Sequence, residues 1–215
     1  AIFLGDFVDR GPYQRETIEI ARNMCSAGTA RAVMGNHEFN AIAFATKIDG
    51  RYLRDRSWKN IKQHLDFLWE FDNDIDEYRN TIDWCKSLPL YLELNKSRVV
   101  HACWDQHFID KLNTEYSGPV LTDNLLMAAC DRTTWEYQAI ETLLKGKEVP
   151  LPDGHSFLDK DKNPRQHIRI RWWEKTVTTY REAFLGPDNV VNQIPDAPIN
   201  TDLLVEYAET EPPVF

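Results

Sequence analysis

The sequence contains no run of about 18 apolar residues, which is the length that a membrane-spanning helix requires. Cysteine is scarce as well. Cys25, Cys85, Cys103 and Cys130 show no CxxC or other paired spacing, and each has apolar neighbours. Such cysteines are expected to be buried, reduced thiols, and they favour a cytoplasmic setting over a disulfide-stapled secreted one.

The sequence also lacks an excess of positive charge. Its 215 residues include 25 Lys and Arg against 34 Asp and Glu, a formal net charge of −9. Proteins that bind nucleic acid through its phosphates usually present a basic face, so a nucleic acid is not expected as a partner. Without a spanning segment, a membrane is not expected either. Bound divalent cations would offset part of the negative charge.

The length suits one sizeable domain, and 42% hydrophobic residues are ample for a core. We predict a single domain over residues 1–215. The stretch 106–165 is less regular and contains several prolines and glycines, so we expect it to form an insertion or a cap.

The order of the elements predicts an α/β fold. A short buried strand at 1–5 ends at Gly5, a helical pattern follows Pro12, and 30–35 forms a second strand that leads into a helix. Helices are also expected at 57–71, 75–87 and 174–185, and strands at 91–94, 98–102 and 167–173. In the helix 57–71 the expected inward stripe is Trp58, Ile61, Leu65 and Leu68, with His64 facing solvent.

Three strand ends carry polar residues of the kinds that bind metals. They are GDFVDRG at 5–11, GNHE at 35–38 and VHA at 100–102. Asp, Asn and His are ligands for hard or borderline divalent ions, and the carboxyl ends of strands are where sites form in open α/β sheets. A buried carboxylate such as Asp6 would be costly without a partner, and a metal would provide one.

GDxVDRG followed by GNHE and a histidine at a strand end resembles the calcineurin-like metallophosphoesterases, in particular their phosphoprotein phosphatase branch. The resemblance is sharp over 1–47 and around 97–105; the remainder is most similar to bacterial members related to diadenosine tetraphosphatases. It implies a four-layer α/β/β/α sandwich with two divalent metal ions, most plausibly manganese, iron or zinc, at the strand ends. The implied roles are metal binding for Asp6, Asn36 and His101, general acid catalysis for His37, support of that imidazole by Asp9, and phosphate binding for Arg10 and Asn36.

The implied reaction is in-line attack of a metal-bound hydroxide on phosphorus, with His37 protonating the leaving oxygen. The first candidate substrate is a phosphomonoester, either a phosphoprotein or a small phosphoester. The alternative is a dinucleoside polyphosphate, whose adenine Trp104, Trp172 or Trp173 would stack; a Trp104 that only packs beside His101 is the other interpretation of that residue. Arg171 resembles a second phosphate-binding arginine of the family, although an arginine in a surface ion pair is an equally good interpretation.

Two blocks of the family pattern are missing from the chain. An Asp-x-His block is expected before Ala1, and a late Gly-His block is expected beyond the final EPPVF, where a strand could begin. Gly154-His155 imitates the late block, but its turn context makes it a poor ligand candidate. Two non-catalytic alternatives are that Asp6 and Asp9 only cap a helix, or that the chain is an inactive, phosphate-binding remnant.

Overall fold

The structure is a computed structural model that describes residues 1–159, 162–205 and 211–215. Its α-helices are α1 Gln14–Ser26, α2 Asn36–Ala45, α3 Trp58–Gln63, α4 Leu65–Glu70, α5 Ile75–Ser87, α6 Gln106–Tyr116, α7 Asp123–Ala129, α8 Trp135–Lys145, α9 Tyr180–Ala183 and α10 Asp188–Val191, with a 3₁₀ turn η1 at Thr201–Leu203. Its strands are β1 Ile2–Phe3, β2 Arg31–Ala32, β3 Lys47–Ile48, β4 Arg51–Tyr52, β5 Tyr91–Leu94, β6 Ser97–Val100, β7 Glu148–Pro150, β8 Phe157–Leu158, β9 Pro164–Arg165 and β10 His167–Arg169.

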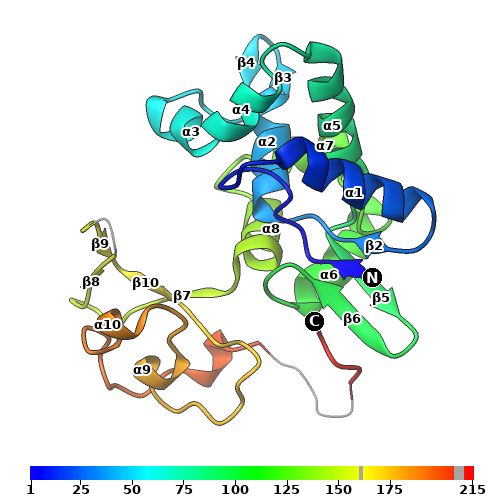
Figure 1. Cartoon of the computed structure of the whole chain (residues 1–215). Helices are drawn as coiled ribbons and strands as arrows, with labels where there is room; N and C mark the ends of the chain where they lie inside the picture. Colours follow the sequence, from blue (N-terminus) through cyan, green and yellow to red (C-terminus); the bar gives the residue numbers. More distant parts are fainter. Residues whose placement is uncertain (160–161, 206–210) are drawn as a thin grey trace.

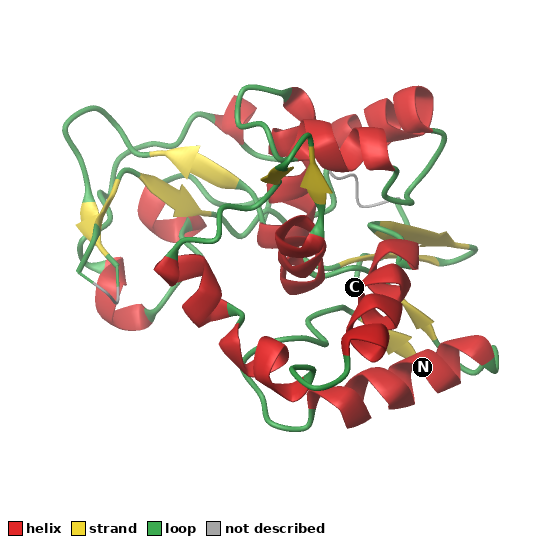
Figure 2. Ribbon diagram, turned by 90° about the horizontal axis from the view of Figure 1, so that it is seen from above, coloured by secondary structure: helices red, strands yellow, loops and turns green. Residues whose placement is uncertain are grey.

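The predicted α/β class is confirmed, and the regular structure consists of more helix than strand (Figure 2). Within the described residues, the strands pair two by two: β1 with β2, β3 with β4, β5 with β6, β7 with β10 and β8 with β9. Among those residues, no helix is long and apolar enough to cross a membrane.

The parallel pair β1–β2 positions two of the polar strand ends. Phe3 pairs with Ala32, and the Val33 N–H donates to the Phe3 carbonyl at 3.0 Å. Extended backbone continues beyond this pair, because the Met34 N–H donates to the Pro89 carbonyl at 2.8 Å. Since parallel strands end at the same edge, the loops that begin at Gly5 and Gly35 emerge side by side.

The antiparallel pair β5–β6 positions the third strand end. Its turn at Asn95 and Lys96 is the predicted one, and His101 follows the last residue of β6. Pro213–Phe215 lies parallel to β6: the Phe215 N–H donates to the Arg98 carbonyl at 2.9 Å, and the Val100 N–H donates to the Phe215 carbonyl at 3.0 Å. The expected extended segment at EPPVF therefore forms.

Helix α2 runs through the middle of the molecule, with α5 and α8 packed against it (Figure 1). Its side chains Ala41 and Ile42 are fully buried. The end of α8 contacts the segment after His101, because the Ala102 N–H donates to the Leu143 carbonyl at 3.1 Å. The role of 106–165 as a cap, like the single-domain boundary, stays a prediction.

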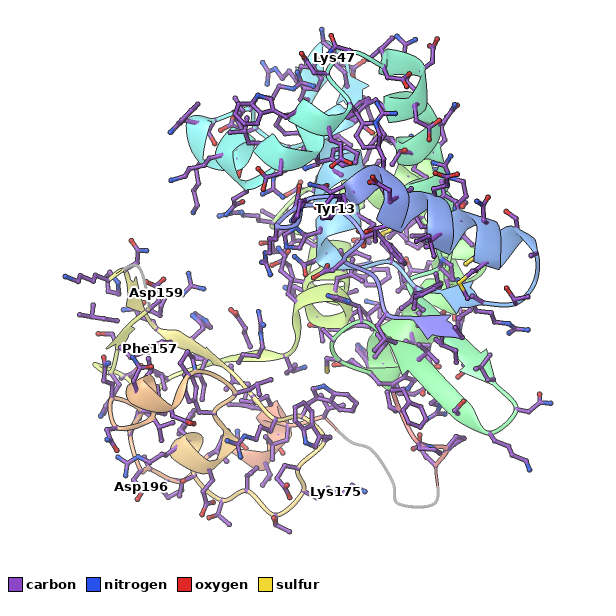
Figure 3. All side chains as sticks on the ribbon, viewed as in Figure 1. Tyr13, Lys47, Phe157, Asp159, Lys175 and Asp196 are labelled. Atoms are coloured by element: carbon purple, nitrogen blue, oxygen red, sulfur yellow. The ribbon has the colours of Figure 1, made fainter. Side chains whose placement is uncertain are left out.

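Residues from β7 to η1 form the lower left part of the molecule in Figure 1, where Phe157 and Asp196 are labelled in Figure 3. Only the first part of the strand predicted at 167–173 forms, as β10, which pairs with β7 through Ile168 opposite Val149. The helix expected at 174–185 is much shorter. It starts only at Tyr180, because Thr179 and Glu182 form a capping box there.

The single helix expected at 57–71 is wrong: two short helices, α3 and α4, meet at His64. The expected inward stripe also differs, because Trp58 is 72% exposed. The buried stripe is His64, Phe67 and Phe71, which has the same spacing of three and four residues. Ring stacking of His64 on Phe67, with centroids 4.7 Å apart, helps to fix this rotation.

Candidate metal and acid–base site

Two glycines allow the strand-end loops to touch. A Cβ on Gly5 would lie 2.4 Å from the Gly35 backbone nitrogen, and a Cβ on Gly35 would lie 2.5 Å from Asp6 Oδ1. Gly5 also has a φ of 86°, a left-handed conformation that glycine adopts without strain. The Asp6 carboxylate therefore lies directly against the start of α2.

A buried glutamate holds the first loop in shape. The Glu38 carboxylate accepts backbone N–H groups from Asp6 at 2.8 Å, Phe7 at 2.7 Å, Val8 at 3.2 Å and Gly35 at 2.9 Å. Complete burial raises the pKa of Glu38, and the N–H donors offset part of that effect. Glu38 was not among the predicted site residues. The sequence feature that could have identified it is its position three residues after Gly35, where a capping box has its glutamate.

Asp9 joins two histidines. Its Oδ2 lies 2.7 Å from His37 Nδ1, and its Oδ1 lies 2.7 Å from His64 Nδ1. The side chains are 4%, 9% and 6% exposed for Asp9, His37 and His64. Burial acts to raise the pKa of Asp9, but the hydrogen bonds from both imidazoles outweigh it and lower that pKa. The carboxylate thus fixes both rings with their Nδ1 atoms turned inward.

Buried Gln14 supports the same loop from its other side. Its side-chain oxygen accepts the Asp9 N–H at 2.8 Å, and its side-chain nitrogen donates to the Gly11 carbonyl at 3.1 Å. Gln14 opens α1 directly after Tyr13, which is exposed and labelled in Figure 3. The loop carrying Asp9 is therefore held at both ends, by Glu38 and by Gln14.

The expectation that His64 faces solvent is wrong. His64 is 4% exposed and lies between Phe44, with ring centroids 5.3 Å apart, and Phe67. Its Nε2 is buried and has no hydrogen-bond partner among the residues that the structure describes. The charged residues around His64 in the sequence favoured an exposed position. The feature that indicated burial was the position of Phe67 and Phe71, three and seven residues after His64 on the same helical face.

Asp6 and His101 form a second pair. Asp6 Oδ1 lies 3.5 Å from His101 Nε2, and His101 Nδ1 is in hydrogen-bond contact with the Leu4 carbonyl. A carbonyl can only accept, so Nδ1 carries the proton and the Nε2 of a neutral ring faces the carboxylate as a lone pair. Two acceptors that face each other are typical of ligands for a cation. Asn36, the first residue of α2, follows the Gly35 that contacts Asp6.

These donors fit part of a metal site. Asp6, His101 and the neighbouring Asn36 offer one carboxylate, one imidazole and one amide, a set that suits a divalent transition ion. Within the described ranges, no group of three or more His, Cys, Asp or Glu side chains is gathered as a ligand cluster. Asp6 and His101 lie close enough to share an ion, and the role of Asp6, Asn36 and His101 as ligands stays a prediction.

The two predicted phosphate-binding arginines differ in their placement. Arg10 follows Asp9, is exposed, and forms no side-chain hydrogen bond or ion pair within the described part of the chain, so its guanidinium is available to a ligand. Arg171 is exposed on the lower part of the molecule. Its neighbour Trp172 donates from Nε1 to the Ala102 carbonyl at 2.8 Å, one residue beyond His101. The roles of both arginines stay predictions.

Several residues weighed for the site lie elsewhere. Trp104 is 1% exposed and packs edge-on against Tyr91, so the expectation that it stacks a substrate base is wrong. Trp173 is 51% exposed. His155 is exposed on a turn and contacts the Asp153 carbonyl at 3.3 Å. All four cysteines are free thiols, as predicted; Cys85 and Cys103 are buried as expected, whereas Cys25 and Cys130 are only half-buried.

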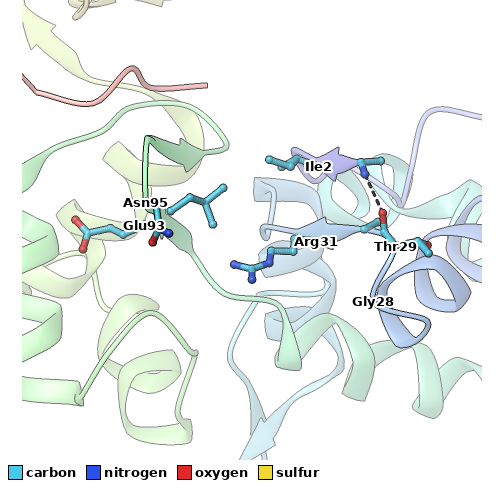
Figure 4. Close-up of a pocket in the computed structure, with 9 residues that line it drawn as sticks. Ile2, Gly28, Thr29, Arg31, Glu93 and Asn95 are labelled. Atoms are coloured by element: carbon cyan, nitrogen blue, oxygen red, sulfur yellow. Dashed lines mark hydrogen bonds between the residues drawn. The ribbon is translucent and has the colours of Figure 1, made fainter.

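A cavity of about 480 Å³ lies at the opposite end of β1 and β2 (Figure 4). Its charged residues are Arg31, Glu93 and the chain's amino group, which donates to the Thr29 carbonyl at 2.9 Å. None of the strand-end residues lines it. The amino ends of parallel strands are not where sites form in α/β sheets, so this cavity plays no part in the candidate site.

Comparisons with known proteins agree with these motifs. The family model described as calcineurin-like phosphoesterase matches residues 1–188. A symmetrical bis(5'-nucleosyl)-tetraphosphatase of Ralstonia nicotianae is 34% identical over 100 residues, which cover 46% of this chain and 31% of the relative. Proteins of the same description from Janthinobacterium sp. and Shewanella sp. (strain W3-18-1) are 33% identical over 101 residues (47% of this chain, 32% of the relative) and 29% identical over 97 (45% and 30%). The chain thus spans about a third of the length of the curated relatives it matches.

Proposed function

Because the chain belongs to the calcineurin-like phosphoesterase family, we propose that it is a metal-dependent phosphoesterase and that its substrate is a dinucleoside polyphosphate. The names of its relatives favour this substrate over the phosphomonoester hypothesis, since they are described as symmetrical bis(5'-nucleosyl)-tetraphosphatases. The observation that carries the proposal is the geometry of Asp9 and His37 beside the facing pair of Asp6 and His101.

Members of the family normally use divalent metal ions. We propose that Asp6, Asn36 and His101 hold one such ion, with manganese, iron or zinc the best match to a donor set that includes imidazole. A bound divalent ion supplies charge neutralisation for the attacked phosphoryl group and makes water a better nucleophile. The short contact of His101 Nδ1 with the Leu4 carbonyl supports the proposal, because it leaves Nε2 free for the ion.

His37 is proposed as the general acid. Its Nδ1 is held by Asp9 at 2.7 Å, so its Nε2 points away from that carboxylate, and in the imidazolium form Nε2 would carry the proton that is passed to the leaving phosphate oxygen. Asp9 keeps the ring in that orientation and stabilises the imidazolium, and it remains ionised because its pKa is lowered. Arg10, whose guanidinium has no competing partner among the described residues, would bind phosphoryl oxygens through its planar fork.

The test compares turnover and metal content in the wild type, His37→Ala and Asp6→Asn. Rates are measured with diadenosine tetraphosphate and with p-nitrophenyl phosphate, and bound metal by elemental analysis. We expect His37→Ala to lose at least about a hundredfold in kcat with its metal retained, and Asp6→Asn to lose metal and activity together. A wild-type protein that binds no metal and turns over neither substrate would instead support an inactive remnant.

A further inference from the structure

A second cavity, of about 540 Å³, is lined in part by α2, the helix that begins at Asn36. It is lined by residues of α2, the 53–63 segment, the end of α7, α8 and β9. In Figure 1, α3, α8 and the β8–β9 hairpin border the same side of the molecule.

Helix α2 connects this cavity to the candidate metal ligands. Asn40 and Ala43 line the cavity and lie four and seven residues after Asn36, so the three share one face of the helix. At a rise of about 1.5 Å per residue, Asn40 lies about 6 Å along the axis from Asn36. A ligand whose phosphoryl group is near Asn36 therefore reaches the cavity by following this face.

The cavity is basic in a protein whose net charge is −9. Five cationic side chains line it against the two carboxylates of Asp55 and Glu141. Glu141 is already paired with Lys145. The other cations have no carboxylate partner among the residues that the structure describes; they are Arg54, Lys59, Arg132 and Arg165. Such a concentration of unpaired positive charge favours an anionic ligand.

Arg54 is the most informative of these cations because it is half-buried. Its Nη2 donates to two neutral acceptors, Asn60 Oδ1 at 3.2 Å and Gln63 Oε1 at 2.9 Å, and its backbone N–H donates to the Ala43 carbonyl at 3.0 Å. The guanidinium is thus fixed in place without a direct ion pair among the described residues, although the carboxylates of Asp9 and Glu141 are near enough to act on its charge. Removing a charge from water without an ion partner is costly, and an anion in the cavity would offset that cost.

Tyr137 adds an aromatic surface to the same wall. It is half-buried on the first turn of α8 and lines the cavity together with Arg132. An aromatic ring next to unpaired cations suits a ligand that combines a planar base with phosphates. From these observations we propose that the cavity binds the part of the substrate beyond the hydrolysed phosphate, namely the distal phosphates and one nucleoside. This inference rests on the proposed function.

The test removes charge at two exposed positions that are expected not to affect folding, in the double variant Lys59→Gln/Arg132→Gln. The measured quantity is the ratio of kcat/KM for diadenosine tetraphosphate to kcat/KM for p-nitrophenyl phosphate, a substrate that has neither the distal phosphates nor a nucleoside. We expect this ratio to fall about tenfold or more, through a higher KM for the larger substrate. Added salt, which screens exposed charges, should raise that KM less in the variant than in the wild type. The matched control is Arg79→Gln, which removes an exposed arginine on α5 and leaves the ratio unchanged.

A binding measurement separates this inference from the proposed function. Diadenosine tetraphosphate is titrated calorimetrically in the presence of EDTA, where no metal-dependent turnover occurs. Binding that is lost in the double variant supports the cavity even if the protein hydrolyses no phosphoester. Hydrolysis by the wild type with an unchanged ratio and unchanged binding in the double variant overturns the cavity and leaves the proposed function standing.

Discussion

The contact between His64 and Asp9 can be tested by removing one hydrogen-bond donor. Leucine at position 64 keeps an apolar side chain of similar size between Phe44 and Phe67 but cannot donate to Asp9. Asparagine can donate, because its amide nitrogen is placed two bonds beyond Cβ, as Nδ1 is in histidine. His64→Leu and His64→Asn therefore form a matched pair that differs in the donor.

The size of the effect follows from the burial of Asp9, whose side chain is 4% exposed. A hydrogen bond to a buried charged group contributes about 1.5–3 kcal/mol, so His64→Leu should lower the free energy of unfolding by that amount. Without His64, Asp9 is held by His37 at only one of its two oxygens. A misplacement of about 1 Å in the acid costs up to about a hundredfold in rate, so we expect kcat to fall about 10–100-fold.

The assay compares phenyl phosphate with p-nitrophenyl phosphate, since the less acidic phenol depends more on protonation by His37. We expect His64→Leu to reduce kcat more for phenyl phosphate than for p-nitrophenyl phosphate, and His64→Asn to recover most of both rates. His107→Leu, an exposed histidine on α6, serves as the control. Equal losses for the two substrates, or no recovery in His64→Asn, would show that His64 does not act through Asp9 on the acid.

Three further predictions concern the loops around this site. Gly35→Ala places a methyl group 2.5 Å from Asp6 Oδ1 and should reduce both the bound metal, measured by elemental analysis, and the rate of hydrolysis. The control Gly11→Ala, whose methyl group meets nothing within 4 Å, should change neither. Glu38→Gln turns an amide donor toward backbone N–H groups and should lower the free energy of unfolding by about 2–3 kcal/mol in urea denaturation. Because the pKa of Asp9 is lowered in the folded state, its ionised form stabilises the fold above about pH 4, and this stability is lost as the pH falls through the folded-state pKa. In Asp9→Asn the free energy of unfolding should therefore fall less steeply with pH below about pH 4. Acid denaturation followed by circular dichroism measures this slope.

The strand-end motifs could be predicted from the sequence because their chemistry and their position are both local. GDFVDRG and GNHE each follow a short apolar strand, and the parallel pairing of β1 with β2 is the ordinary outcome of a β-α-β order. The same holds for α5 and for the β5–β6 hairpin, whose turn residues Asn95 and Lys96 lie between two alternating runs.

The contacts that hold the site together could not be predicted in this way. His64 lies 55 residues from Asp9, and nothing in its own neighbourhood shows that a carboxylate will meet it. Glu38 contacts the backbone N–H groups of a loop about 30 residues away. Every residue other than proline has such a group, so the side chains of the loop do not indicate this contact. The basic cavity likewise collects Arg54, Arg132 and other residues from distant segments, and only packing brings their charges together.

The clasp of Glu38 on the backbone of residues 6–8 has a consequence for protein engineering. The loop at residues 5–11 takes its shape from the side chain of Glu38, which belongs to the segment 35–38, so the two segments form one structural unit. A chimera that imports residues 5–11 from a relative while keeping the host helix works only if the imported backbone offers its N–H groups at the same points. Grafting the loop and the start of α2 together avoids this mismatch.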